Sequence, residues 1–172
     1  ASDVYKRQQE DVIDLRPDVL SVFVGTNDAE RHLGRLLRAD DPKTVPDFDF
    51  ADWERTYRGL LDQARQANPA LKIVLCTPFA APCGKIVEGA LGEYYPLRQR
   101  ILAQCCVIVE RIAADYGATL VPFHRLIADL ETRLPNGDAT YWVWDGIHPT
   151  PAGQRLMADC WIGAAARSGV ME

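Results

Sequence analysis

The stretch DVLSVFVGTND, residues 18–28, decides the fold class of this chain. It opens with a short apolar run rich in β-branched residues, and Gly25 ends that run, which is typical of a strand buried on both faces. Pro17 precedes the run and separates it from QQEDVIDLR, residues 8–16, which we expect to be the last turns of a helix. A polar turn directly after a buried strand is where α/β proteins bind ligands.

Further along the chain, strand-like and helix-like segments alternate. Two more short apolar runs predict strands over 71–77, LKIVLCT, and 118–123, ATLVPF. Four segments have apolar residues at helical spacing and recognisable ends. The predicted helices are 52–68, 97–116, 124–134 and 151–166, with Asp52 and Thr150 as N-caps, Gly117 as a left-handed C-cap and Pro135-Asn136-Gly137 closing the third. We expect a long loop with one helical turn over 29–51, and mostly loop over 79–96.

This alternation predicts an α/β protein with a parallel sheet covered by helices on both faces. Residues 25–28 would lie at the carboxyl end of a strand, where such folds bind their ligands. A chain of 172 residues fits one domain, which we assign to residues 9–172. Residues 1–8, ASDVYKRQ, lack both an apolar core and a capping pattern, and we expect a non-native or disordered leader there.

The segment WVWDGIHPTPAG, residues 142–153, places Asp145 three residues before His148 and directly before the last helix. Asp145 can accept the Nδ1–H of His148, fix the tautomer of the ring and stabilise the imidazolium. Nε2 is then free to act as a general base and afterwards as a general acid. Alone, this spacing fits an exposed histidine beside a loop aspartate better than a catalytic pair, so it needs support from a second motif.

Asn27 is that second candidate, because it follows the first strand directly. Its side-chain NH₂ can donate a hydrogen bond to a developing oxyanion, which stabilises a transition state by about 3 kcal/mol in a site that excludes water. The alternative is an asparagine that only makes the turn, since this residue tolerates left-handed backbone and bonds its own backbone. We expect Asp28 to brace the turn rather than to react.

Together, the two motifs resemble the GDSL/SGNH hydrolase family. Gly25-Thr26-Asn27-Asp28 matches the G-x-N-D block of that family, and Asp145-Gly146-Ile147-His148-Pro149 matches its D-x-x-H-P block. The resemblance covers residues 11–166 with the family's order and spacing. It implies a three-layer α/β/α flavodoxin-like fold and carboxylic ester hydrolysis. In that scheme Asn27 is the oxyanion donor, His148 the base and Asp145 its orienter.

The resemblance also implies a substrate class. It points to a small acyl ester, as in the acetylesterase or lysophospholipase-like enzymes, and to no metal or organic cofactor. Trp142 and Trp144 stand just before the second motif and could line an acyl or sugar pocket. We favour core positions for both tryptophans, which is the commoner place for large aromatic side chains.

The family's serine nucleophile has no counterpart in the sequence. The family carries a G-D-S block at the end of its first strand, and no G-D-S occurs here. Ser2 is in the leader, Ser21 is inside the predicted buried strand and Ser168 is in the C-terminal tail, so none is a credible nucleophile. Cys83 is the substitute to consider, but no local motif supports it and we favour a packed thiol. We therefore expect an N-terminally truncated hydrolase that lacks its first strands and is itself inactive.

Composition restricts the partners. A net charge of −5 without a basic stripe argues against nucleic acid, and the apolar runs are too short to span a bilayer. The five cysteines form no C-x-x-C pair, which predicts free buried thiols and favours the cytoplasm. His32 and His124 lack an acidic partner at motif spacing, and we expect both at the surface or in loops.

Of two other candidate functions, one fits part of the pattern. A degenerate hydrolase that binds a carbohydrate or lipid without cleaving it is supported by the missing serine. A flavodoxin-like nucleotide-binding domain would need a glycine-rich phosphate loop, which the sequence lacks. Loss of a central first strand would also leave one edge of the strand at 18–24 unpaired, so we expect self-association through that edge.

Overall fold

A computed structural model describes residues 9–133 and 139–172 of the chain. The predicted leader and the predicted helix end at 135–137 lie outside the described residues. The strands are β1 (Val19–Phe23), β2 (Lys72–Cys76) and β3 (Thr119–Val121). The helices are α2 (Thr26–Arg38), α3 (Phe50–Ala67), α4 (Gly89–Glu93), α5 (Tyr95–Tyr116), α6 (Phe123–Arg133) and α7 (Pro151–Arg167). Short helical turns lie at Gln9–Ile13, Pro42–Thr44, Gly84–Val87 and Ala139–Tyr141.

The three strands form one parallel sheet in the order β1-β2-β3, as the alternation of elements predicts. Ser21 of β1 pairs with Val74 of β2, which in turn pairs with Thr119 of β3. All three carboxyl ends therefore lie along the same side of the sheet. Among the described strands, β1 forms one outer edge and has a partner only on its β2 side.

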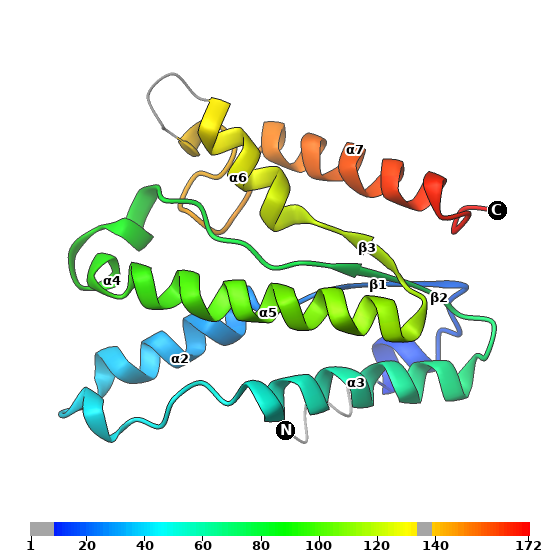
Figure 1. The fold of residues 1–172 in the computed structure, drawn as a ribbon, viewed down its shortest axis with the longest axis horizontal. Helices are drawn as coiled ribbons and strands as arrows, with labels where there is room; N and C mark the ends of the chain where they lie inside the picture. Colours follow the sequence, from blue (N-terminus) through cyan, green and yellow to red (C-terminus); the bar gives the residue numbers. More distant parts are fainter. Residues whose placement is uncertain (1–8, 134–138) are drawn as a thin grey trace.

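Helices cover the sheet on both faces, which gives three layers (Figure 1). Val74 and Cys76 of β2 belong to a core cluster with α6 and α7, whereas Ile73 and Leu75 belong to a cluster with α3 and α5. Successive strand residues point to opposite faces, so a strand covered on both faces must be apolar at every position. The uninterrupted apolar run in the sequence is the direct consequence.

The predicted loop over 29–51 is wrong in its first half, where α2 is a helix of 13 residues. Ala29, Leu33 and Leu36 recur at helical spacing and form its buried face. Ala29 packs in a cluster with Ile101 of α5, and the two helices lie side by side in Figure 1. The period was present in the sequence, but charged residues on the outer face of α2 made the segment look like a polar loop.

Most predicted helix ends are confirmed. Gly117 ends α5 in the left-handed conformation with φ 58°, and the Thr150 side chain accepts a hydrogen bond from the Gly153 N–H at 3.2 Å. The predicted N-cap of α3 is wrong by three residues. Asp49 is the cap, and its carboxylate accepts the N–H of Asp52 at 2.9 Å. The predicted loop over 79–96 also contains α4 and a short helical turn.

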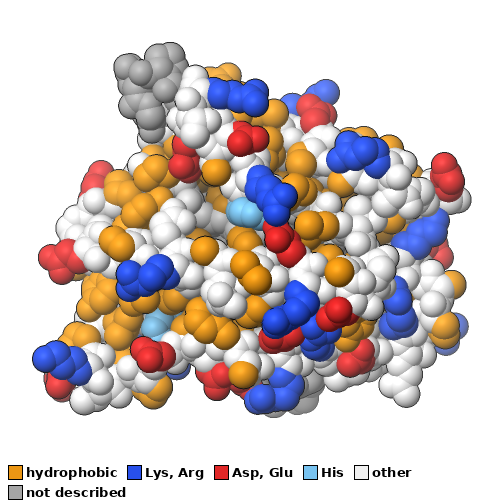
Figure 2. Space-filling model, viewed as in Figure 1, with side chains coloured by type: hydrophobic (Ala, Val, Ile, Leu, Met, Phe, Trp, Pro, Cys, Tyr) orange, Lys and Arg blue, Asp and Glu red, His pale blue; other side chains and the backbone are white. Residues whose placement is uncertain are grey.

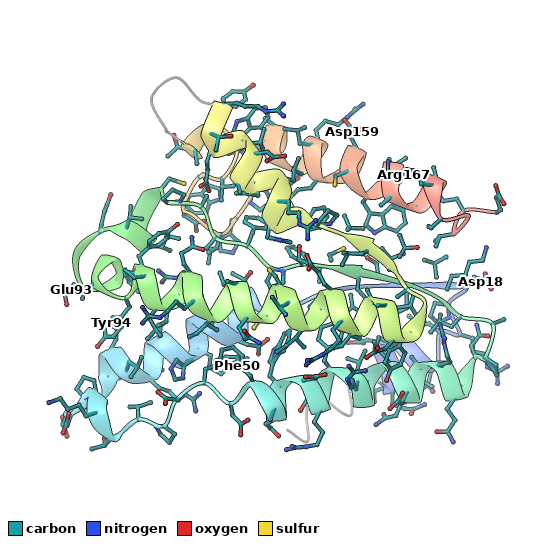
Figure 3. The ribbon with its side chains drawn as sticks, in the orientation of Figure 1. Asp18, Phe50, Glu93, Tyr94, Asp159 and Arg167 are labelled. Carbon is teal, nitrogen blue, oxygen red and sulfur yellow. The ribbon has the colours of Figure 1, made fainter. Side chains whose placement is uncertain are left out.

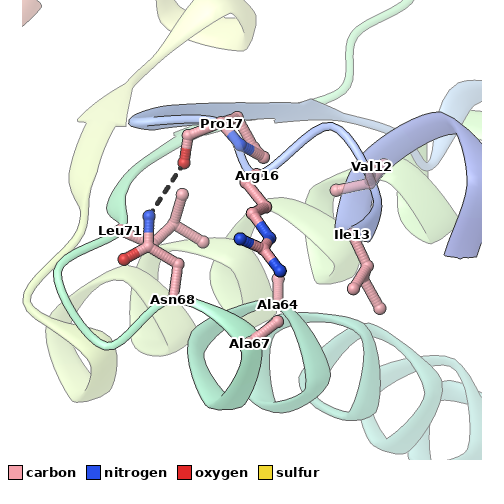
Figure 4. A pocket seen from close by; sticks show the side chains of 8 residues that line it. All are labelled: Val12, Ile13, Arg16, Pro17, Ala64, Ala67, Asn68 and Leu71. Atoms are coloured by element: carbon pink, nitrogen blue, oxygen red, sulfur yellow. Dashed lines mark hydrogen bonds between the residues drawn. The ribbon is translucent and has the colours of Figure 1, made fainter.

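The segment before β1 contains a helical turn at Gln9–Ile13, of π type, within the stretch predicted as helix. It packs against the end of α3, and the two enclose a small apolar cavity of about 10 Å³ (Figure 4). The Asn68 side chain donates a hydrogen bond to the Pro17 carbonyl oxygen at 3.0 Å, which ties the entry of β1 to the end of α3.

The surface carries both signs of charge. Figure 2 shows acidic and basic side chains interspersed over one face of the molecule. Figure 3 shows Asp159 and Arg167 projecting from α7, and both are exposed. Within residues 9–133 and 139–172, no helix combines the length and the apolar character needed to cross a membrane.

All five cysteines are free thiols, as predicted, and every one except Cys160 is buried. Burial raises the pKa of Cys76 to about 11 and those of Cys105 and Cys106 to about 12. A thiol reacts as its thiolate, so these three groups are inert near neutral pH.

Candidate active site

The turn after β1 depends on a glycine. Gly25 has φ 121°, and a Cβ placed on it would lie 2.8 Å from Cγ of Pro78, so no other residue fits without strain. The chain then enters α2, and the Thr26 hydroxyl donates to the Phe79 carbonyl oxygen at 3.1 Å. These contacts place Asn27, which is exposed, in the first turn of α2 at the carboxyl end of β1.

Asp28 braces this turn, as predicted. Its carboxylate accepts a hydrogen bond from the indole N–H of Trp53 at 3.2 Å and lies 3.5 Å from the Arg31 guanidinium. Trp53 lies on α3, so Asp28 links the start of α2 to a second helix.

The loop before α7 holds the second half of the candidate site. Oδ2 of Asp145 lies 2.7 Å from Nδ1 of His148, and Oδ1 accepts the backbone N–H groups of Ile147 at 3.1 Å and of His148 at 2.8 Å. Because an ionised carboxylate only accepts hydrogen bonds, Nδ1 carries the proton. Nε2 is therefore the basic nitrogen of the ring, and 62% of the His148 side chain is exposed.

Electrostatics keep Asp145 ionised. Burial alone would raise the pKa of this carboxyl, but the hydrogen bonds from the His148 ring and from the backbone of His148 and Ile147 outweigh burial. The pKa of Asp145 is therefore lower than its ordinary value. A carboxylate that stays charged can both orient the imidazole and stabilise the imidazolium.

The two halves meet at one cleft of about 410 Å³ beside the carboxyl end of β1. Asn27 and His148, which are far apart in the sequence, both line this cleft. The remaining lining residues are Phe23, Val24, Gly25, Thr26, Asp28, Arg31, Ile147 and Pro149. Neither a serine nor a cysteine is among them. A larger groove of about 760 Å³ lies beside α2 and α5, but it contains none of the three predicted site residues.

The tryptophans before the motif have different environments. Trp142 is half-buried against the core, as predicted, but Trp144 is 58% exposed, so the core prediction is wrong for it. The Trp144 ring stacks on the His148 imidazole with centroids 5.9 Å apart and an interplanar angle of 23°. Val143 between them is fully buried and forms a β-bridge with Pro149. The bridge anchors the loop at Val143 and leaves the next residue, Trp144, exposed to solvent.

The other serine and cysteine candidates lie away from the cleft. Ser21 is exposed, not buried as expected, and accepts a hydrogen bond from the Trp161 indole at 3.1 Å. Ser168, also exposed, bonds the Thr119 hydroxyl at 2.7 Å. Cys83 is a packed thiol, as expected, and donates to the Val143 carbonyl oxygen at 2.9 Å.

The two remaining histidines are less exposed than predicted. His32 is only 3% exposed, because it lies on the inner side of the unpredicted helix α2 with its ring against Phe48. Burial and the neighbouring Arg35 lower the pKa of His32 below its ordinary value, despite the opposing charge of Asp47. His124 is half-buried at the start of α6 and bonds the Thr77 hydroxyl at 2.7 Å.

Sequence reasoning missed two features of the cleft, the helix that carries Asn27 and the exposed ring of Trp144. The helical spacing of Ala29, Leu33 and Leu36 was a usable signal for the helix. No local signal marks the exposure of Trp144, because an irregular loop has no side-chain period. Within the described residues there is also no group of three or more His, Cys, Asp or Glu side chains that could hold a metal ion.

Fold and cleft together define a three-layer α/β protein with a candidate site at the carboxyl edge of a parallel sheet, the class that includes the SGNH hydrolases. The chain belongs to the GDSL-like lipase/acylhydrolase family, which matches residues 1–156.

Several proteins of known structure or activity are similar to this chain over most of its length. An acetylxylan esterase from Geobacillus stearothermophilus is 30% identical over 163 residues, which cover 93% of this chain and 64% of that protein. A crystal structure described as a GDSL-like lipase from Parabacteroides merdae matches with a TM-score of 0.77 at 26% identity, over 98% of this chain and 68% of that one. A catalytic mutant of the acetylxylan esterase Axe2, with a serine changed to alanine, matches with a TM-score of 0.69 at 26% identity, over 95% of this chain and 66% of that one. The chain thus spans slightly less than two thirds of the length of the acetylxylan esterase.

Proposed function

We propose that the protein is a carboxylic ester hydrolase of the serine esterase type and acts on small acyl esters, with O-acetylated carbohydrate as the substrate class. The observation that carries this proposal is that Asn27 and His148 line the same cleft. The family membership and the acetylxylan esterase among its relatives support the choice of substrate. No cofactor enters the proposed reaction.

His148 would move the proton, and Asp145 would stabilise its charged form. A nucleophilic hydroxyl attacks the ester carbonyl carbon and passes its proton to Nε2 of His148. Asp145, 2.7 Å from Nδ1, stabilises the imidazolium that forms. His148 then gives the proton to the departing alcohol oxygen, and a water molecule, activated by the same nitrogen, hydrolyses the acyl intermediate.

Asn27 would stabilise the transition state. When the carbonyl carbon becomes tetrahedral, its oxygen takes the negative charge, and an amide N–H donor aimed at that oxygen is worth about 100- to 1,000-fold in kcat. The contacts of Gly25, Thr26 and Asp28 hold the first turn of α2 in place before substrate arrives. A donor that is already positioned loses no free energy to reorganisation during the reaction.

We place the nucleophilic serine outside the described residues, since no serine or cysteine lines the cleft. The serine-to-alanine catalytic mutant of Axe2 supports a serine in this role. The chain alone should then leave p-nitrophenyl acetate and acetylated xylooligosaccharides uncleaved. A longer form of the protein that includes a G-D-S segment should cleave both, and its His148→Ala and Asn27→Ala variants should be strongly impaired.

The lack of a serine in the cleft also favours a second candidate, a degenerate module that binds carbohydrate without cleaving it. Calorimetric titration of the chain with acetylated xylooligosaccharide separates the two proposals. Tight binding weakened by His148→Ala, together with no hydrolysis by any longer form of the protein, would replace the esterase with the binding module. Hydrolysis by this chain that persists in His148→Ala would contradict both.

We further propose that the chain self-associates through the outer edge of β1. Among the described strands this edge has no partner, and Phe23 and Val24 at its carboxyl end are 44% and 43% exposed. Unpaired strand edges recruit other strands, and a lysine on such an edge opposes pairing. Light scattering during size-exclusion chromatography should show dimers or larger species for the chain and more monomer for Ser21→Lys. A stable monomer at all concentrations would contradict this proposal.

A further inference from the structure

A buried arginine links the two halves of the cleft. Arg98 lies on α5, and its side chain is fully buried. Its Nε and Nη2 bond the two carboxylate oxygens of Glu30, the latter at 3.1 Å, and its Nη1 donates to the carbonyl oxygen of Ile86 at 3.2 Å. A two-point guanidinium–carboxylate pair fixes both distance and orientation.

Through Glu30, Arg98 is bonded to the half of the cleft that holds Asn27. Glu30 lies three residues after Asn27 on α2, which is nearly one helical turn. Neighbours three residues apart share one helix face, so a fixed Glu30 also fixes the rotation of the first turn. The Asp28 contact with Trp53 holds the same turn from α3, on a different helix.

Through the carbonyl oxygen of Ile86, Arg98 is bonded to the half of the cleft that holds His148. The Ile86 side chain packs so closely on Gly146 that a Cβ at this glycine would collide with it. Gly84 in the same short turn lies against the backbone of Asp145, where a Cβ would be 2.6 Å from the Asp145 Cα. The Gly84–Val87 turn is thus the support on which the 145–148 loop rests.

We infer that Arg98 is a positioning residue that sets the distance between Asn27 and the Asp145–His148 pair. One guanidinium holds α2 through Glu30 and the supporting turn through Ile86, so neither half of the cleft can shift without breaking one of its bonds. That this distance matters for ester hydrolysis rests on the proposed function. That Arg98 sets the distance does not depend on the proposed function.

The imidazole ¹⁵N shifts of His148 and the side-chain amide signal of Asn27 test this role without any hydrolysis assay. The variants are Arg98→Met, which removes every donor, and Glu30→Gln, which keeps a neutral acceptor. Ile108→Ala is the matched control, because Ile108 is a buried residue of the same helix that packs away from the cleft.

We expect Arg98→Met to move the Asn27 signal and to shift His148 from the Nδ1–H tautomer towards the Nε2–H tautomer. Glu30→Gln should do the same to a smaller extent. Ile108→Ala should lower Tm but leave both signals in place. If Arg98 had a merely structural role, Arg98→Met and Ile108→Ala would affect the two signals alike. If Arg98→Met does not fold, Glu30→Gln and Arg98→Lys decide the question.

Unchanged Asn27 and His148 signals in the folded variants, or equal changes in Ile108→Ala, would overturn the positioning role. Failure of every form of the protein to hydrolyse esters would instead count against the proposed function and leave the spectroscopic result intact. Where a longer form does hydrolyse acetyl esters, Arg98→Lys should lower kcat more than it changes KM, because the positioned groups act in the transition state.

Discussion

The two halves of the cleft are built in different ways. Asn27 stands on a helix whose start is held by a glycine, two side-chain hydrogen bonds and a partly buried ion pair that reach three other parts of the fold. His148 stands on a loop, is largely exposed, and receives its orientation from one carboxylate three residues away. The comparison teaches that the amide donor is positioned by tertiary contacts alone. The base stands on a loop that also rests on the Gly84–Val87 turn, but its ring is oriented by a local carboxylate. Changes near Asn27 should therefore affect stability, and changes near His148 should affect reactivity.

The largest effect is expected for Asp145→Asn in a form of the protein that hydrolyses acetyl esters. The amide can no longer hold the Nδ1–H tautomer or stabilise the imidazolium, so kcat should fall about 10,000-fold, which is about 5.5 kcal/mol. Steady-state kinetics with p-nitrophenyl acetate measures the change, and the circular dichroism spectrum should remain that of the parent protein.

Asp159→Asn is the control, since Asp159 is an exposed residue of α7 that pairs with Arg155. It should leave kcat within twofold of the parent value, in line with the small effect of surface ion pairs. A loss of less than tenfold in Asp145→Asn would mean that the loop does not rely on this carboxylate.

The second largest effect is expected at Gly25, in the half of the cleft that holds Asn27. Gly25→Ala should destabilise the protein by about 3 kcal/mol, because alanine resists φ 121° and its Cβ would collide with Pro78. Urea unfolding measures this loss. Gly59→Ala is the matched control, since Gly59 lies within α3 and nothing comes within 4 Å of its Cβ position. That variant should gain roughly 0.5–1 kcal/mol, and equal effects at the two glycines would refute the strained turn.

A smaller loss of stability is expected when the hydrogen bond between Trp53 and Asp28 is removed, and this loss tests the role of Asp28. Trp53→Phe removes the indole N–H that bonds the Asp28 carboxylate, and a hydrogen bond to a charged group is worth about 2 kcal/mol. Trp161→Phe makes the same change in volume but removes a bond to the neutral Ser21 hydroxyl, which is worth about 1 kcal/mol. Thermal unfolding of both variants compares the two bonds. A larger loss in Trp161→Phe would show that Asp28 does not anchor α2.

Much of this architecture follows from sequence pattern. The strand β2 is recognisable in the sequence because both of its faces are covered and must be apolar. In β1, by contrast, only Val22 is buried, so the burial predicted for that strand is wrong although the strand itself is present. Asp145 and His148 are close in sequence, so their contact is local. Apart from helix α2, whose period is local, the missed features are tertiary. The burial of His32 and Arg98 depends on neighbours from other elements, such as Phe48 and Glu30, that no local period identifies. The exposure of Trp144 depends on how its loop is anchored through Val143.

The smallest expected effect is a difference in the pH at which the two halves of the cleft lose stability. The pKa of His32 on α2 is lowered in the folded protein, so the unfolded chain binds more protons, and stability falls as pH drops below about 6.5. Arg35 and Asp47 are the charged groups that act on His32. Asp145 behaves differently, because its lowered pKa contributes stability above its ordinary value near 3.8, and this stability is lost only as pH falls below that value.

Acidification should therefore loosen α2 before it loosens the 145–148 loop. Amide hydrogen exchange from pH 7 to pH 3.5, corrected for the intrinsic pH dependence of exchange, should show protection of α2 falling first. His32→Asn should remove part of the change between pH 7 and pH 5, and the remainder belongs to His124, whose pKa is also lowered by burial and by Arg125 against Glu110. Simultaneous loss of protection in both segments would mean that the two halves of the cleft unfold as one unit.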